Sequence, residues 1–365
     1  MHIPMSSPDL TDVERQAVWQ VLDTTYLSIG PRLDAFERAV ASYVGAAHGV
    51  GVNSGTSGLH LCVIAAGVEE RDLVLTTSFS FIASANCILY ERAIPVFVDV
   101  DGRTGNLDPA LVAEAAEDLL AGGRRADHWL PKALRGLGGL DRLKALLPVD
   151  AFGQPADMDP LCATAKNHSL VVIEDACEAL GAYYKGRPAG TLGDAGVFAF
   201  YPNKQITTGE GGMIVTNDAE QAGLFRSLRN QGRDVFDGWL NHTRLGYNYR
   251  LDELSAALGE VQMRRIDELI AKRARVAGWY NERLAGVAEV EVPYVAPETT
   301  RMSWFVYVVR VRPPVERDLL VGQLAELGIP SRPYFTPIHL QPFYRNLLGY
   351  GPGDLPVTEA LGATS

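Results

Sequence analysis

Short apolar runs alternate with helical patterns from Val50 to Asp175 of this 365-residue chain. The apolar runs have the length of strands, and the segments between them repeat their apolar residues with helical spacing. In chain order the pairs are GVGV with LHLCVIAAG, LVLTT with IASANCILY, IPVFVDV with DPALVAEAAEDLL, and ALLPV with MDPLCATAKNH, followed by LVVIED. This alternation predicts an α/β fold, with a mostly parallel central sheet that helices cover on both faces.

Helical patterns also flank the alternating region. Thr11 and Glu14 have capping-box spacing and predict a helix in TDVERQAVWQVLD, and RLDAFERAVASYVG predicts a second helix. Residues 251–286 form a long helical stretch rich in Arg, Glu, Leu and Ala. We therefore expect a large domain over residues 1–250, a connecting helical segment over 251–286 and a small C-terminal domain over 287–365.

The small domain is predicted to be α/β as well. Its segments SWFVYVVRV, RDLLVGQLAELG and IPSRPYF predict a strand, a helix and a second strand. No helical pattern closes the chain at EALGATS, so we expect this domain to lack a final helix. In the large domain, the basic and glycine-containing residues 122–143 fit the alternation poorly, and we interpret them as a surface insertion without a chemical role.

Composition narrows the class of protein. With 47% hydrophobic and 21% charged residues, the chain is not expected to be disordered. Its 33 Lys and Arg against 44 Asp and Glu give a formal net charge of −11, which argues against nucleic acid as the main partner. Four cysteines without CxxC spacing indicate neither a disulfide framework nor a metal site. Without a leader pattern or a long apolar run, we expect a cytoplasmic protein that does not span a membrane.

Ligands of parallel α/β sheets collect at the carboxyl ends of the strands, and four such ends carry unusual residues. NSGTSG follows the first predicted strand and begins a helix, and backbone N–H groups at a helix N-terminus suit a phosphate. Ordinary helix capping by Ser54 or Thr56 is the simpler interpretation. The glycines miss the GxGxxG spacing by one, so a dinucleotide site is not indicated.

The other three strand ends offer an aromatic ring, a carboxylate and an amine. Phe79 and Phe81 follow the second strand, where a ring can stack on a flat ligand, although core packing is more usual for Phe. Glu174 and Asp175 end a strand that reads as buried, where an acid needs a partner. Lys204 lies further along, in FYPNKQITTGEGG, and this local sequence alone predicts a solvated loop residue.

One common cofactor, pyridoxal 5′-phosphate (PLP), would use all four places. Its phosphate needs the helix N-terminus and its pyridine ring needs a stacking face. The ring nitrogen needs a carboxylate to stay protonated, and the aldehyde needs a lysine for a Schiff base. The sequence therefore predicts a PLP site at this edge of the sheet.

Three motifs resemble those of the DegT-type sugar aminotransferases, a branch of the fold-type-I PLP-dependent enzymes. They are VIEDACEALGA, FYPNKQITTGEGG and GYNYRLDELSAALG, and the resemblance runs from IPMSSPDL to PIHLQPFY. It implies an aspartate aminotransferase-like fold and an enzyme that moves an amino group from L-glutamate to a keto sugar linked to a nucleoside diphosphate. Such amino sugars would serve a surface polysaccharide or a secondary metabolite.

The resemblance also assigns residues to the cofactor. It makes Lys204 the Schiff-base lysine, Asp175 the partner of the pyridine nitrogen and Phe81 the aromatic residue that stacks on the ring. Thr56 and Ser57 would hold the phosphate.

Further residues follow from the same resemblance. Asn248 is similar to an asparagine that relatives extend to the phosphate in the neighbouring subunit, which implies a homodimer with shared active sites. Tyr201 would lie near the substrate. The chain departs from many relatives at Ala199, where they have a phosphate-binding Ser, and at Glu178, where His or Gln is frequent beside the phenolic oxygen of the cofactor.

The proline-rich segment RPYFTPIHLQPFY is expected to be a loop that exposes Arg332, Tyr334, His339 and Tyr344. One interpretation is a stiff surface segment whose aromatic residues pack on the small domain. By resemblance, the segment instead borders the mouth of the active site, where Arg332, Tyr334 and His339 would hold the sugar substrate.

Other functions remain open at this stage. A PLP-dependent sugar dehydratase is disfavoured because such relatives replace the lysine with His, whereas this chain has Lys204. A PLP-binding regulator without activity is disfavoured because Lys204 and Asp175 are both present. An aminotransferase that acts on a cyclitol ketone shares all the residues named so far.

Overall fold

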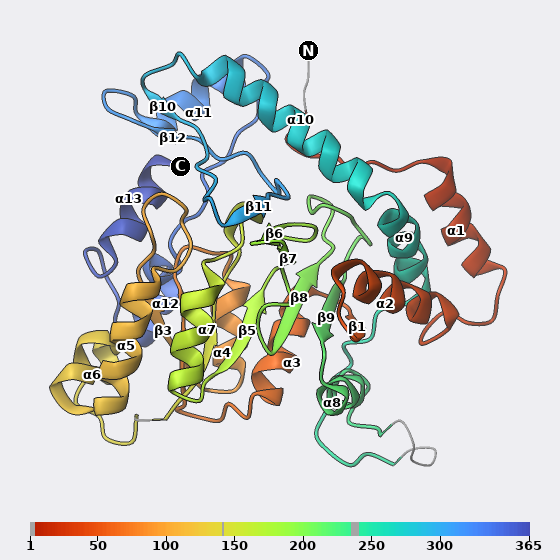
Figure 1. The fold of residues 1–365 in the computed structure, drawn as a ribbon, viewed down its shortest axis with the longest axis horizontal. Coiled ribbons are helices and arrows are strands. Elements are labelled where there is room, and N and C mark those ends of the chain that lie inside the picture. Colours follow the sequence, from red (N-terminus) through yellow and green to blue (C-terminus); the bar gives the residue numbers. More distant parts are fainter. Residues whose placement is uncertain (1–3, 141, 235–240) are drawn as a thin grey trace.

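The computed structural model describes residues 4–140, 142–234 and 241–365, and its core is one large sheet (Figure 1). Within these residues, seven strands pair in the order β1-β9-β8-β5-β4-β2-β3. Only β9 runs antiparallel to its neighbours in this described sheet, so the predicted mostly parallel sheet is confirmed. The strands are β1 (His48–Val52), β2 (Leu73–Thr77), β3 (Ile94–Val98), β4 (Leu143–Leu147), β5 (Val171–Asp175), β8 (Ala195–Ala199) and β9 (Gly212–Thr216).

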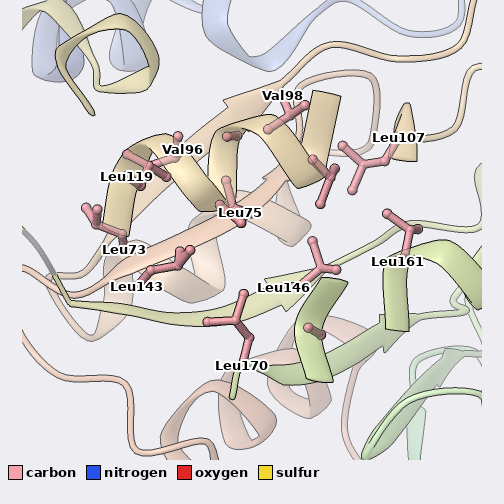
Figure 2. Close-up of a cluster of buried hydrophobic side chains, with 14 of the residues drawn as sticks. Leu73, Leu75, Val96, Val98, Leu107, Leu119, Leu143, Leu146, Leu161 and Leu170 are labelled. Atoms are coloured by element: carbon pink, nitrogen blue, oxygen red, sulfur yellow. The ribbon is translucent and has the colours of Figure 1, made fainter. Parts of the chain in front are cut away.

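Helices cover both faces of the sheet because successive strand residues point to opposite sides. Leu73 and Leu75 of β2 enter the cluster shown in Figure 2, whereas Val74 between them packs on the other face. The first face is covered by α5 (Pro109–Ala121), α6 (Gly123–Trp129) and α7 (Met158–Asn167), and further along the sheet by α2 (Pro31–Val44) and α9 (Glu253–Arg264). The second face is covered by α3 (Gly55–Ala65), α4 (Ala83–Tyr90) and α8 (Ala219–Arg229).

The predicted N-terminal helices are confirmed as α1 (Asp12–Leu22) and α2, and α1 begins with the expected capping box of Thr11 and Glu14. Residues 251–286 form two helices, α9 and α10 (Ile266–Leu284), rather than one stretch. The break falls at Arg265, which leaves helical geometry and bonds through its guanidinium to Glu14 and Asp9. This contact ties the start of the chain to the helices that lead out of the large domain.

The segment over residues 122–143 contains two short helices, α6 and η1 (Lys132–Leu134), before β4 begins. Trp129 of α6 donates to Asp118 of α5 at 3.0 Å, so the segment folds back on the helix that precedes it. Its position outside the sheet agrees with a surface insertion, and the absence of a chemical role stays a prediction.

The C-terminal part contains less regular structure than the sequence predicts. RDLLVGQLAELG forms α11 (Arg317–Glu326), as expected, but SWFVYVVRV is a strand only at β12 (Arg310–Val311), which pairs with β10 (Val290–Glu291). The strand predicted in IPSRPYF is wrong, because residues 329–335 have no regular structure. Two prolines in this segment lack the N–H that a strand needs, and the apolar pattern did not reveal this.

Backbone groups of SWFVYVVRV that would pair with a neighbouring strand bond instead to loops of the large domain. Ser303 N–H donates to Gly153 O at 3.1 Å, and Phe305 N–H donates to Phe152 O at 3.2 Å. A small sheet of β6 (Tyr183–Tyr184), β7 (Arg187–Pro188) and β11 (Thr299–Arg301) makes a second connection of this kind. The chain after α10 therefore returns to the large domain instead of forming an independent sheet.

The end of the chain lies against the large domain as well. After η3 (Ile338–Leu340) and α12 (Pro342–Leu348), residues Pro356–Thr364 form α13, so the expectation that EALGATS closes without a helix is wrong. Asp99, which follows β3, accepts bonds from Val357 N–H at 2.9 Å and Thr358 N–H at 2.8 Å and so holds the first turn of α13. Among the described residues, no helix is both long and apolar enough to cross a membrane.

Candidate active site

The functional residues meet at one edge of the sheet. Strands β1, β2, β4, β5 and β8 all run in the same direction, so their carboxyl ends face the same edge. The N-terminus of α3 packs closely on this edge, because a Cβ placed on Gly55 would lie 2.8 Å from both Cys177 Sγ and Ala199 Cβ. No side chain larger than hydrogen fits there, so Gly55 brings the helix N-terminus next to the ends of β5 and β8.

Lys204 lies in the loop that joins β8 to β9, and it is not a solvated loop residue. Its side chain is only 13% exposed, and its Nζ lies 3.5 Å from Glu178 Oε1. On another side, Nζ lies 3.9 Å from the centre of the Phe305 ring. The interpretation of Lys204 as an ordinary surface cation is therefore wrong, and the amine is held between a carboxylate and an aromatic face.

Asp175 ends β5 and is almost completely buried. Its Oδ2 accepts a bond from Ser84 Oγ at 2.7 Å, and its Oδ1 accepts one from Cys177 N–H at 3.2 Å. Two donors hold the carboxylate in one orientation, and each oxygen keeps a lone pair for a further donor. The sequence analysis missed Ser84, although a hydroxyl in the first turn of a helix that follows a strand end was a signal for it.

Phe81 is linked to this carboxylate through Ser84. Its carbonyl accepts a bond from Ser84 Oγ at 3.2 Å, the same hydroxyl that donates to Asp175. The Phe81 side chain is 64% exposed, whereas Phe79, two residues earlier, is buried in the core. Of the two candidate rings, only Phe81 is therefore open to a ligand.

Both interpretations of NSGTSG, helix capping and phosphate binding, are compatible with the N-terminus of α3. Ser54 Oγ caps the helix by accepting from Ser57 N–H at 3.1 Å. The hydroxyl of Ser57 donates to Asn53 Oδ1 at 2.6 Å. The N–H groups of Gly55 and Thr56 belong to the first turn, where a helix offers them no acceptor of its own, so a phosphate can bind them.

Glu178 faces Lys204 from the turn after β5. Its Oε2 accepts a bond from Phe152 N–H at 2.9 Å. Burial raises the pKa of the Glu178 carboxyl, and the nearby Lys204 opposes that increase. Gln205, which the sequence analysis did not single out, donates to the Glu178 carbonyl and to Ser303 Oγ, so it joins this turn to the C-terminal part.

Asn248 and Tyr201 lie at the margin of the site. The carbonyl of Asn248 accepts from Asn53 Nδ2 at 3.5 Å, so GYNYR runs beside the α3 N-terminus of its own chain. The Asn248 side chain is exposed. Tyr201 is 52% exposed and its carbonyl accepts from Lys204 N–H at 2.9 Å, which places it at the start of the lysine loop. The roles of both residues stay predictions.

The proline-rich segment divides into two halves. Arg332 is exposed, and the half-buried Tyr334 packs its ring 6.2 Å from that of Phe305, so this half lies close to Lys204. The expected exposure of His339 and Tyr344 is wrong, because both are completely buried.

The His339 side chain is fully occupied within the protein. His339 Nδ1 lies 2.7 Å from Ser78 Oγ, and its Nε2 lies 3.1 Å from Glu359 Oε1. Tyr344 donates to Asn86 Oδ1 at 2.7 Å. Their polar atoms attach the segment to the end of β2 and to α4, so we assign both residues to packing and not to substrate binding.

Comparison with known proteins decides the family. The DegT/DnrJ/EryC1/StrS aminotransferase family matches residues 8–364. The chain belongs to this family. Members and structural neighbours are PLP-dependent sugar aminotransferases, and this chain is a PLP-dependent aminotransferase of the same fold.

Individual relatives agree over nearly the whole length. GDP-perosamine synthase of Caulobacter vibrioides is 41% identical over 364 residues, which are 99% of this chain and 91% of that protein. The structure of DesV from S. venezuelae has a TM-score of 0.85 and 33% identity and covers 99% of this chain and 92% of its own. The PLP form of Spr1654 from Streptococcus pneumoniae has a TM-score of 0.87 and 25% identity, with 100% and 92% covered.

The residues at the sheet edge fit PLP in their chemistry. The exposed Phe81 offers a stacking face, and its backbone is linked through Ser84 to the buried Asp175 carboxylate, an acceptor for a protonated ring nitrogen. The first turn of α3 provides N–H groups for a phosphate dianion. Lys204 provides an amine that is held in place 3.5 Å from the Glu178 carboxylate. These groups come from four separate strand ends, as a cofactor that spans the edge requires.

Proposed function

We propose that this enzyme transfers an amino group from L-glutamate to a keto sugar linked to a nucleoside diphosphate. The observation that carries the proposal is the position of Lys204, whose amine lies between Glu178 and Phe305 at the same sheet edge as Asp175 and the α3 N-terminus. The named relatives that act on nucleotide-linked sugars support the class of acceptor. A GDP-linked keto sugar is the first to test, because the Caulobacter relative is a GDP-perosamine synthase.

The cofactor-holding roles follow from the site. Thr56, Ser57 and the N–H groups of the α3 first turn would hold the phosphate, Phe81 one ring face and Asp175 the ring nitrogen. Glu178, which lies 3.5 Å from Lys204 Nζ, would by resemblance face the phenolic oxygen of the cofactor. When bound, PLP supplies an electron sink and a carrier for the amino group.

The protein moves the protons. Lys204 would carry the cofactor and, once released, take a proton from the α-carbon of the amino donor. Glu178 lies 3.5 Å from this amine and can keep its protonated form paired, while the aromatic face of Phe305 limits where Nζ can move. Asp175, held by Ser84 and Cys177, keeps a negative charge fixed where a proton on the ring nitrogen needs a partner.

The substrate would enter past Tyr201 and the Arg332–Tyr334 half of the proline-rich segment. Both tyrosines lie close to Lys204, Tyr201 through its carbonyl and Tyr334 through its packing on Phe305. Arg332 is exposed, and a guanidinium suits a diphosphate. Arg332→Ala should raise the KM for the sugar nucleotide several-fold and leave the half reaction with glutamate unchanged.

The test of the function uses the purified holoenzyme. With L-glutamate alone, we expect one equivalent of 2-oxoglutarate per site. Addition of a GDP-linked or another nucleoside-diphosphate-linked keto sugar should then give continuous turnover and an amino sugar detectable by mass spectrometry. Turnover with a free cyclitol ketone and none with any sugar nucleotide would contradict the proposed acceptor.

A homodimer with shared sites is the second part of the proposal. Two observations support this part: Asn248 is exposed, so a second chain could contact it, and its backbone lies beside the proposed phosphate-binding turn. Mixing Lys204→Ala with Asn248→Ala protein should restore part of the activity, because some heterodimers would contain one intact site. With subunit exchange confirmed independently, the absence of recovery would favour a site within one chain.

A further inference from the structure

Arg273, on the first half of α10, donates to backbone carbonyls of the loop that contains Lys204. Its Nη2 donates to Lys204 O at 2.5 Å and to Asn203 O at 3.2 Å. Its Nη1 donates to Phe305 O at 2.9 Å and to Trp304 O at 3.2 Å. One guanidinium therefore holds four carbonyls from two segments about 100 residues apart, as its rigid fork of donors allows.

The surroundings of Arg273 are unusual for a cation. The side chain is partly buried, and burial lowers the pKa of its guanidinium. Within the described parts of the chain, Arg273 forms no ion pair with a carboxylate, whereas the neighbouring Lys272 of α10 pairs with Asp9 and Glu268. A buried charge without a counter-ion is costly, so its four carbonyl contacts must offset that cost.

One of these contacts stabilises a strained residue. Trp304 has a φ of 53°, a left-handed conformation that a bulky side chain rarely adopts. Such a conformation persists only where the surrounding structure fixes it. Here Arg273 binds the Trp304 carbonyl, and the neighbouring Phe305 N–H donates to Phe152 O at 3.2 Å. The turn at Trp304 directs the next residue, Phe305, towards Lys204.

Arg273 joins the segment that contains Lys204 to the segment that contains Phe305, and the side chains of these two residues are in contact. Lys204 Nζ lies 3.9 Å from the centre of the Phe305 ring, and Arg273 holds the backbone of both residues. We propose that Arg273 is a positioning residue that fixes Lys204 against Phe305 and so confines the amine to the space beside Glu178. This inference rests on the proposed function, in which Lys204 carries the cofactor, and it adds a residue outside the cofactor site.

The test measures the reactivity of Lys204 in cofactor-free protein. Acetylation by an amine-reactive ester, followed by peptide mass spectrometry over pH 6–10, gives the labelling rate of each lysine. We expect Arg273→Met and Phe305→Leu each to change the rate at Lys204 by about three-fold or more, as the loss of an aromatic contact to an amine predicts. The double variant should add nothing further, because both changes remove one contact. Lys166, exposed on α7, is the internal reference.

Two further variants separate positioning from folding. Arg275→Met changes an exposed arginine of the same helix and should leave the labelling of Lys204 as in wild type. Arg273→Lys keeps the charge but loses the fork and should give a change of the same sign, which covers the case in which Arg273→Met does not fold. In the holoenzyme, these Arg273 variants should lower kcat up to about 100-fold with little effect on the KM for the sugar.

Unchanged labelling of Lys204 in a folded Arg273 variant would overturn the proposal, even if activity fell. Additive effects of Arg273→Met and Phe305→Leu would also overturn it, since the two residues would then act separately. The labelling needs neither PLP nor a sugar, so the failure of the proposed acceptor would not affect this result.

Discussion

The carboxyl edge of the sheet and residues 303–340 both contribute to the active site, yet they are built in different ways. At the sheet edge, each functional residue ends or follows a regular strand, and its neighbours are set by the order of the strands. In residues 303–340, regular structure is limited to β12, α11 and η3, and contacts with distant residues fix the backbone. Arg273 and Ser78 provide such contacts, at Phe305 and His339.

The difference bears on what each region can do. The sheet edge holds Asp175 through two donors from its own domain, which suits a residue that must stay fixed during the reaction. The C-terminal segment exposes Arg332 but buries His339 seven positions later, so it can vary its outer half while its inner half stays attached. We infer that the sheet edge determines the chemistry and that the outer half of the segment influences the choice of sugar.

The largest effect is expected at the sheet edge. Asp175→Asn keeps the size of the side chain but removes its charge, so activity should fall by about 100-fold or more while PLP still binds. Steady-state turnover and the absorbance of bound PLP measure the two properties separately. Asp159→Asn, a half-exposed acid on α7, is the control and should change activity little. Near-normal turnover of Asp175→Asn would remove this residue from the mechanism.

In the C-terminal segment, by contrast, His339→Ala should lower stability rather than activity. The change removes a completely buried side chain and its bonds to Ser78 Oγ and Glu359, so we expect the free energy of unfolding to fall by about 2 kcal/mol. Denaturant unfolding measures this loss, and the KM for the sugar should stay near the wild-type value. A raised KM with unchanged stability would return His339 to the substrate site.

The same histidine predicts a pH dependence. Burial lowers the pKa of His339 from its ordinary value of 6.5, although Glu359 opposes the shift. The unfolded chain therefore takes up the proton first as the pH falls, so the stability due to neutral His339 is complete above the unfolded pKa and is lost below it. His339→Gln lacks this titration, so the difference in Tm between wild type and variant should shrink from pH 7 to pH 5. Parallel curves would contradict the assignment.

A smaller effect is expected at Ser84, which supports Asp175 without contacting the substrate. Ser84→Ala removes one of two donors to the carboxylate and should lower turnover about ten-fold, as the loss of a hydrogen bond to a charged group predicts. Ser80→Ala removes a hydroxyl that bonds to Ser84 Oγ at 2.7 Å, and it should cost less. An equal or larger effect of Ser80→Ala would show that Asp175 does not depend on Ser84 as the geometry indicates.

The sequence predicted the sheet edge well for a physical reason. Hydrophobic alternation locates strands, and in a parallel sheet the strand ends must meet, so Asp175, Phe81 and the α3 N-terminus could be grouped from local patterns. Ser84 and Gln205 were missed because their partners depend on side-chain direction. In the C-terminal part, SWFVYVVRV has the composition of a strand, but its backbone groups pair with Arg273 and with the loop at Phe152. Local patterns do not reveal such partners, and for the same reason His339 was expected to be exposed.

Borohydride reduction of the PLP-loaded enzyme, followed by peptide mapping, tests the central claim most directly. Reduction makes the linkage between PLP and its lysine permanent, so the modified lysine identifies itself by mass. The account predicts one phosphopyridoxyl group per chain on Lys204 and none on that peptide in Lys204→Ala protein, with Lys166→Ala modified as in wild type. Modification of a different lysine at full occupancy would contradict the assignment of Lys204 and the active site built around it.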